Sequence, residues 1–282
     1  LNMIPLLVGI GSALLFAIMN IIVTYKLGSL DPLILLFSRG MVAVILLGPF
    51  VVRDIPSLFT RAAFSVHLRS VFGAMAVICT FWALQNTSSL HASFLASLAP
   101  MFLMILIFIF YGNTLKSIQL IGLVCVIVGT LLVAGGPRAN ASNAVWLIGI
   151  TGAFLSSLAM LFLKEATLLF SPQLIVFNFS VLFVIVGSYG LLTFAPSISL
   201  VLWLGLMGIC SVFGQVLMTL SYKLLDPQIA NAFGRTLLIW VGLIEFVMFG
   251  SNPGIIDFSG YLISLVGLLV LTVRKPSFLI KH

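Results

Sequence analysis

Apolar segments long enough to cross a lipid bilayer recur ten times along this chain. A helix rises about 1.5 Å per residue, so about 20 residues span the hydrocarbon core. With 62% hydrophobic and only 7% charged residues, the composition excludes a soluble domain. We therefore predict an all-α integral membrane protein whose ten transmembrane helices form one compact bundle. The expected spans are residues 3–25, 32–52, 67–87, 91–112, 117–136, 144–165, 173–195, 198–222, 227–250 and 255–273.

The basic residues are distributed unequally between the two ends of these spans. On the side opposite the N-terminus lie only Lys26 and Arg138, and basic residues concentrate on the cytoplasmic side of membrane proteins. Both termini are therefore expected in the cytoplasm, in a multi-pass protein of the inner (plasma) membrane. This topology accounts for the net charge of +7 without a nucleic-acid partner. The first span lacks a basic leader and is expected to remain in the membrane. The nine residues on the N-terminal side are Arg53, Arg61, Arg69, Lys116, Lys164, Lys223, Arg274, Lys275 and Lys281.

The chain also repeats itself at a constant offset of 138 residues. We expect two repeats, residues 1–137 and 138–282, of five helices each. Because five is odd, the repeats have opposite orientation, as in many secondary transporters, which bind substrate near the midplane between repeats. Ten helices with accidental similarity are the alternative. The pairs that share the offset are Gly11 with Gly149, Lys26 with Lys164, Ala92 with Ala230, Gly122 with Gly260 and Gly129 with Gly267.

Polar side chains interrupt the predicted ninth span, residues 227–250, at Asn231, Arg235 and Glu245. Charge at membrane depth is costly, so such residues usually face a cavity, a partner or a substrate. Snorkelling of Arg235 and Glu245 to the headgroups is the alternative, since neither lies far from a span end. A guanidinium offers a bidentate donor fork, which predicts that Arg235 holds an anionic group of the substrate, such as a carboxylate.

The predicted fourth span carries an equivalent polar face. Ser93, Ser97 and Pro100 share one helical face, and adding 138 to their numbers gives Asn231, Arg235 and Leu238. Substrate binding between the two faces and close helix packing by the small serines are both compatible with this pattern. Asn20, Trp82, Gln85 and Gln215 are further candidate substrate contacts, and Asn178 and Trp240 are others, although packing in the core or against lipid also explains the tryptophans.

Two charges in different spans are predicted to lie at one depth. Arg39 lies about 10 Å below the outer end of its helix and Glu245 about 7 Å below the same face, at about 1.5 Å per residue. Opposite charges within a bundle tend to pair. We predict that Arg39 and Glu245 form a coupling or gating pair; a permanent structural pair, or each residue facing water alone, are the alternatives.

No catalytic or metal-binding motif occurs in this sequence: HExxH, GxSxG and the P-loop are all missing. Cys79, Cys125 and Cys210 lie in apolar spans without metal-ligand spacing, and His91 is expected as an exposed cap or interface residue. We therefore predict no enzyme activity, cofactor or metal, and transport driven by a gradient or running downhill.

Five segments resemble one known family: LLFSRGMVAVILLGPFVV, HLRSVFGAMAVICTFWALQNTS, LHASFLASLAPMFLMILIFIFYGN, IGLVCVIVG and FGRTLLIWVGLIEFVMFGSNP. They are similar to the drug/metabolite transporter superfamily in its EamA-type branch, and the last is similar to carriers likened to S-adenosylmethionine uptake proteins. The resemblance implies ten helices, cytoplasmic termini and alternating access, for export or uptake. Family members usually carry a Glu at the end of helices four and nine, where this chain has Asn113 and Ser251.

The function expected from these observations is secondary transport of a small polar metabolite by alternating access. The leading substrate class is an amino acid or a related compound, with S-adenosylmethionine as one example. A passive channel, or an intramembrane enzyme that modifies lipids, is the alternative. The expected partners are a small-molecule substrate and the lipid bilayer, together with a homodimer contact through the glycine-rich fifth and tenth spans.

Overall fold

Helices make up all the regular structure of this computed structural model in the residues it describes, which are 4–111, 117–134, 142–193, 197–225, 230, 233–234, 236–250 and 254–272. In that part of the chain, seven helical segments are long and apolar enough to cross a bilayer. Three shorter apolar helices, Ser117–Val133, Thr236–Phe249 and Ile255–Val270, complete the ten predicted segments. The all-α membrane architecture is therefore confirmed.

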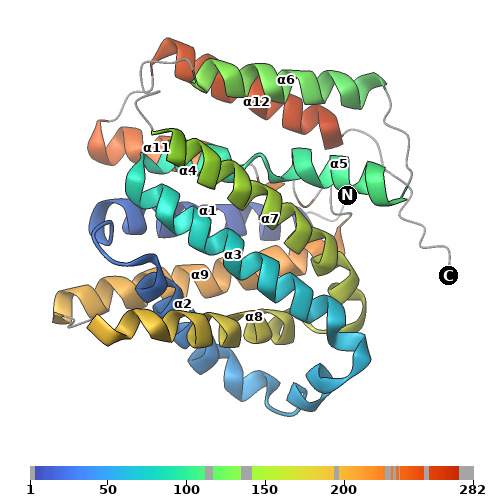
Figure 1. Cartoon of the computed structure of the whole chain (residues 1–282), viewed down its shortest axis with the longest axis vertical. Coiled ribbons are helices and arrows are strands. Elements are labelled where there is room, and N and C mark those ends of the chain that lie inside the picture. The colour runs from blue at the N-terminus through green and yellow to red at the C-terminus, as the bar shows by residue number, and fades with distance from the viewer. Residues whose placement is uncertain are drawn as a thin grey trace.

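The main helices form one bundle (Figure 1). Their bounds are α1 Ile4–Lys26, α2 Pro32–Val51, α3 Phe64–Asn86, α4 Ser89–Ala96, α5 Ala99–Tyr111, α6 Ser117–Ala134, α7 Asn143–Leu169, α8 Pro172–Gly187, α9 Ile198–Leu224, α11 Thr236–Phe249 and α12 Ile255–Thr272. Short 3-10 turns, η1 Ile55–Phe59, η2 Arg61–Ala63 and η3 Ser188–Thr193, connect α2 to α3 and extend α8.

Capping side chains fix where several helices begin. Asp31 accepts a hydrogen bond from the Leu33 N–H at 2.7 Å at the start of α2. Ser88, Ser171 and Ser197 cap α4, α8 and α9 in the same way. A short polar side chain at this position satisfies a backbone donor that the first helical turn leaves free. The caps therefore fix the residues at which these helices begin.

The predicted fourth span is broken rather than continuous. α4 ends at Ala96 and α5 begins at Ala99, with Ser97 in the turn between them. Pro100 lies in the first turn of α5, where a missing backbone N–H costs little.

Helix packing follows a pseudo-two-fold relation between the repeats. The contact of α3 with α7 has its counterpart in that of α9 with α1, and the contact of α2 with α9 in that of α8 with α3. α2 and α8 pack on each other, as do α6 and α12. This pairing is the one expected for two inverted five-helix repeats. The predicted boundary between residues 137 and 138 lies outside the described residues.

Glycines bring α6 and α12 together at one edge of the molecule (Figure 1). A Cβ on Gly260 would meet the Gly129 carbonyl oxygen at 2.8 Å, and one on Gly267 would meet the Gly122 oxygen at 2.7 Å. The predicted close packing of these spans is confirmed, and it occurs within one chain. A homodimer stays a prediction.

Candidate functional site

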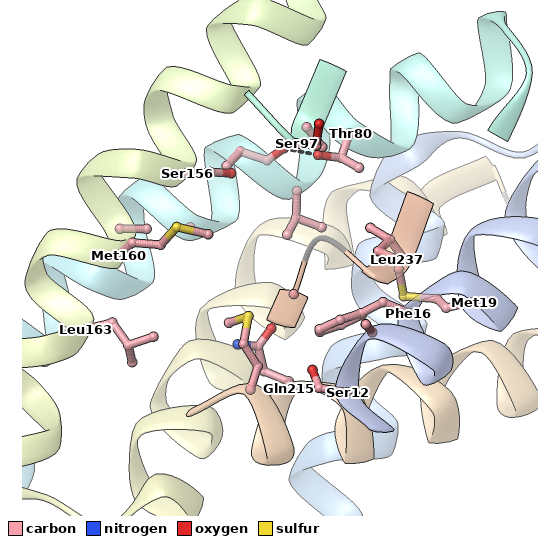
Figure 2. Close-up of a pocket in the computed structure, with 18 of the residues that line it drawn as sticks. Ser12, Phe16, Met19, Thr80, Ser97, Ser156, Met160, Leu163, Gln215 and Leu237 are labelled. Carbon is pink, nitrogen blue, oxygen red and sulfur yellow. Dashed lines mark hydrogen bonds between the residues drawn. The ribbon is translucent and has the colours of Figure 1, made fainter. Parts of the chain in front are cut away.

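A cavity of about 210 Å³ lies between the two repeats (Figure 2). The first repeat lines it with α1, α2, α3 and α4, and the second with α7, α8, α9 and α11. Apolar side chains, among them Phe16, Met19, Met160 and Leu163, form much of the wall. A mostly apolar pocket with a few placed polar groups is typical of small-molecule sites.

Uncharged polar groups occupy one side of this cavity. Figure 2 shows Ser97, Thr80 and Ser156 close together there. Ser97 follows the last residue of α4, Thr80 belongs to α3 and Ser156 to α7. Asn20 of α1 also lines the cavity, and its Nδ2 donates to Ser93 Oγ at 2.9 Å. The Ser97 and Thr80 hydroxyls donate to the Phe94 and Ala76 carbonyls at 2.6 Å and 2.9 Å. Since a hydroxyl oxygen can also accept, this side suits a polar, uncharged part of a ligand that donates hydrogen bonds.

Two buried arginines lie in the cavity wall. The exposed fractions of Arg39 and Arg69 are only 5% and 4%. Arg39 Nη2 donates to Gln215 Oε1 at 2.9 Å, and Figure 2 shows Gln215 on the side of the cavity away from Ser97. Arg69 stacks on Phe179, with its Cζ 3.9 Å from the ring centroid. Within the described part of the chain, no carboxylate forms an ion pair with either guanidinium.

Several donors around the arginines have no hydrogen-bond partner among the described residues. They are Nε and Nη1 of Arg69 and Nε2 of Gln215. Buried polar groups are nearly always hydrogen-bonded in proteins, so each such donor calls for an explanation. These donors allow the cavity wall to form hydrogen bonds with an acceptor group of a ligand.

Glu245 lies in a separate polar cluster, 1% exposed. Its Oε1 accepts hydrogen bonds from the Ser89 hydroxyl at 2.5 Å, the Ser89 N–H at 3.1 Å and the Tyr25 hydroxyl at 3.2 Å. Tyr25 stacks on Phe249 with ring centroids 3.7 Å apart. We call Tyr25, Ser89, Glu245 and Phe249 the Glu245 cluster. It joins the end of α1, the start of α4 and the end of α11.

The predicted pair of Arg39 with Glu245 is not formed in this structure. Arg39 contacts Gln215, and Glu245 contacts Ser89 and Tyr25. The reason is that α2 packs on α8, α9 and α3, whereas α11 packs on α1 and α4. Equal depth in the membrane therefore did not place the two charges on the same side of the bundle.

The other predicted site residues divide into two groups. Asn20, Ser97 and Gln215 line the cavity, and Ser93 supports Asn20. Gln85 instead donates to the Leu30 carbonyl at 2.6 Å, and Trp82 packs in a hydrophobic cluster. Trp240 also packs there, and Asn178 donates to Ser70 at 2.8 Å.

Asn231 and Arg235 lie outside the described residues. Their neighbours Ala230 and Gly234 line the cavity. The predicted roles of Asn231 and Arg235 stay predictions.

Two residues differ from the sequence-based expectation. His91 is 1% exposed and meets Trp146 edge to face at 5.0 Å, so the expected exposed position was wrong: α7 covers the start of α4. Arg69 was counted among the cytoplasmic basic residues, yet it lines the cavity. Arg69 lies on the cavity-lining face of α3, because Gly73, Ala76 and Thr80 follow it at spacings of three or four residues and also line the cavity.

Comparison with known proteins agrees with this architecture. The model of the EamA-like transporter family matches residues 3–135. An uncharacterized transporter of Helicobacter pylori (strain ATCC 700392 / 26695) is 25% identical over 277 residues, which cover 91% of this chain and 93% of the relative. The pseudopaline exporter CntI of Pseudomonas aeruginosa (strain UCBPP-PA14) is 24% identical over 213 residues, 74% of each chain. A solved crystal structure shares the fold, with a TM-score of 0.70 at 17% identity, over 94% of this chain and 95% of that chain.

The matched family region covers the first repeat, and the relatives extend the similarity across both repeats. Residues 3–135 are thus similar to the EamA-like transporter family, and most of the chain is similar to proteins named as transporters. Together with the bundle of apolar helices, these similarities support a membrane transporter.

Proposed function

We propose that the protein is a secondary transporter that moves a small polar metabolite across the inner membrane by alternating access. The observation that carries this proposal is the cavity, which both inverted repeats line with polar groups. Transporters built from inverted repeats bind substrate at the repeat interface and expose it to each side by rocking one part against the other. An amino acid or a related compound is the substrate class.

The size of the cavity supports a small substrate. Its volume of about 210 Å³ lies below the range of about 300–1,000 Å³ that is usual for drug-sized ligands. The Glu245 cluster supports the alternating-access part of the proposal, because it ties three helices together beyond the cavity lining. Opening it would separate α1, α4 and α11.

Counterflow in proteoliposomes tests this function. Vesicles loaded with an unlabelled candidate amino acid should accumulate the labelled compound transiently and saturably, which a channel does not do. Ser97→Trp should abolish counterflow by filling the cavity. Thr151→Trp, on the exposed face of α7, is the matched control and should transport normally. Linear, non-saturable flux would establish a channel, and equal transport by Ser97→Trp would show that the cavity is not the substrate path.

A further inference from the structure

We propose that this cavity binds an anionic group, a carboxylate or a phosphate, through Arg39, Arg69 and Gln215. The inference rests on the proposed function, since it treats the cavity as the substrate site. It assigns the anion to residues of α2, α3 and α9.

The first argument is charge. Arg39 and Arg69 place two positive charges in the wall of one cavity, each at least nine-tenths buried. A charge at membrane depth is costly unless a partner compensates it. The buried carboxylate of Glu245 accepts hydrogen bonds from Ser89 and Tyr25 instead. Among the described residues the two guanidiniums thus lack a counter-charge, and a bound anion would supply one.

The second argument is the orientation of the donors. A guanidinium can only donate hydrogen bonds, so Gln215 must present its carbonyl oxygen to Arg39. This leaves the Gln215 amide nitrogen, a donor, without a partner among the described residues, together with Nε and Nη1 of Arg69. All three atoms are hydrogen-bond donors that a ligand acceptor could satisfy. Carboxylate and phosphate oxygens are the acceptors that guanidiniums bind best.

The third argument is that aromatic rings hold both guanidiniums in place. Arg69 Cζ lies 3.9 Å from the Phe179 centroid, and Arg39 Cζ lies 5.3 Å from that of Phe183. Cation–π contact of this kind stabilises a cation without neutralising its charge. The donors are therefore positioned before a ligand arrives, which lowers the entropic cost of binding.

The opposite side of the cavity completes the ligand description. Ser97, Thr80 and Ser156 offer uncharged hydrogen-bonding groups there (Figure 2). A matching ligand carries its anionic group at one end and a neutral polar group at the other.

Binding to the purified, full-length protein tests the charge requirement directly. Five compounds serve as probes: succinate and its amide succinamide, L-alanine and its amide L-alaninamide, and inorganic phosphate. We expect succinate, L-alanine or phosphate to raise Tm and to bind in calorimetry, and the two amides to bind at least tenfold more weakly than their acids. Amides that bind as tightly as the acids, with no binding of phosphate, would overturn the inference.

Variants of the arginines test the assignment to these residues. Arg39→Gln and Arg69→Gln should each weaken binding of the anionic probe at least tenfold. Arg39→Lys and Arg69→Lys keep the charge but lose the planar fork, so they should bind the anionic probe with intermediate affinity. They replace the Gln variants in this test if the Gln variants do not fold. Arg61→Gln, at an exposed position of η2, removes the same charge away from the cavity and should bind like wild type.

The two proposals fail in different ways. Arginine-dependent anion binding without counterflow would overturn the transport function and leave the anion site standing. Counterflow of an uncharged compound that is unaffected in the arginine variants would overturn the anion site and leave transport standing. Unchanged anion affinity in all four arginine variants would equally overturn the site.

Discussion

The Glu245 carboxylate shows how this protein accommodates a single buried charge. Oε1 accepts three hydrogen bonds, two of them from Ser89 at the N-terminus of α4. The partial positive charge of a helix N-terminus further favours an anion there. Arg39, in contrast, donates to the uncharged Gln215 Oε1, and aromatic rings lie beside both Arg39 and Arg69. In the described part of the chain, Glu245 thus has donors around Oε1, whereas neither buried arginine is paired with a carboxylate.

Glu245→Ala is expected to destabilise the protein by about 1–3 kcal/mol, because it leaves buried donors without an acceptor. Glu245→Gln keeps an acceptor oxygen and should lose less. Thermal unfolding in detergent measures both. Tyr25→Phe removes only the longest of the three bonds and should have the smallest effect. A Tm of Glu245→Ala equal to that of wild type would show that the cluster does not hold α1, α4 and α11 together.

Gly73 is the residue that makes room for the Arg69 stack. A Cβ at this position would meet Phe179 Cε2 at 2.7 Å. Gly73→Ala should therefore displace the ring or the guanidinium and weaken binding of the anionic probe, while the protein still folds. Gly11→Ala is a suitable control, because its Cβ would meet only a flexible Leu217 methyl at 3.6 Å. Unchanged affinity in Gly73→Ala would show that the stack does not position Arg69.

At the scale of elements, glycines allow α6 and α12 to approach each other closely through their backbones, as Gly40 and Gly187 do for α2 and α8. Without a hydrophobic driving force in lipid, transmembrane helices associate through tight packing of small residues. The Ser264 hydroxyl adds a hydrogen bond of 3.4 Å to the Val126 carbonyl across the same contact. α6 and α12 occupy equivalent positions in the two predicted repeats, and each contributes its equivalent glycines to the contact.

Gly267→Ala should lower Tm clearly, because its Cβ would lie 2.7 Å from the Gly122 carbonyl oxygen, and backbone cannot easily move away. Gly205→Ala in α9 is the matched control, since nothing lies within 4 Å of its Cβ. Alanine favours a helix over glycine by about 1 kcal/mol, so this variant should be neutral or slightly more stable. Equal Tm values for the two variants would mean that α6 and α12 do not need this contact.

At the scale of the whole molecule, the pseudo-two-fold relation is incomplete in one respect. The positions 138 residues from Tyr25 and Glu245 are Leu163 and Ile107, which are both buried and apolar. The hydrogen bond between Tyr25 and Glu245 therefore has no polar counterpart at the equivalent positions. A transporter with such repeats would close its two sides by different chemistry.

The proposed topology places both termini in the cytoplasm. Cysteines introduced near either terminus, in a variant without the native cysteines, should react with a membrane-impermeant thiol reagent only after the membrane is opened. A cysteine at position 138 should react in intact cells. Termini on opposite faces would contradict both the ten-helix count and the inverted repeats. Arg69 lines the cavity, but the eight remaining basic residues still outnumber the two on the other side.

The sequence by itself determined the class, the number of helical segments and the relation between the repeats. Bilayer thickness sets the length of an apolar segment, and a constant offset survives as a linear pattern, so both are visible along the chain. Asn20, Ser97 and Gln215 could be selected as site residues because polar groups in a span usually face a cavity.

Only the tertiary structure decided which helix faces which. Position along a span gives depth, but the direction in which a side chain points depends on the neighbours that its helix packs against. For that reason Arg39 meets Gln215 and not Glu245, Arg69 enters the cavity, and His91 is buried under α7. The break at Ser97 is likewise a tertiary feature, since the interrupted backbone lies where it lines a cavity.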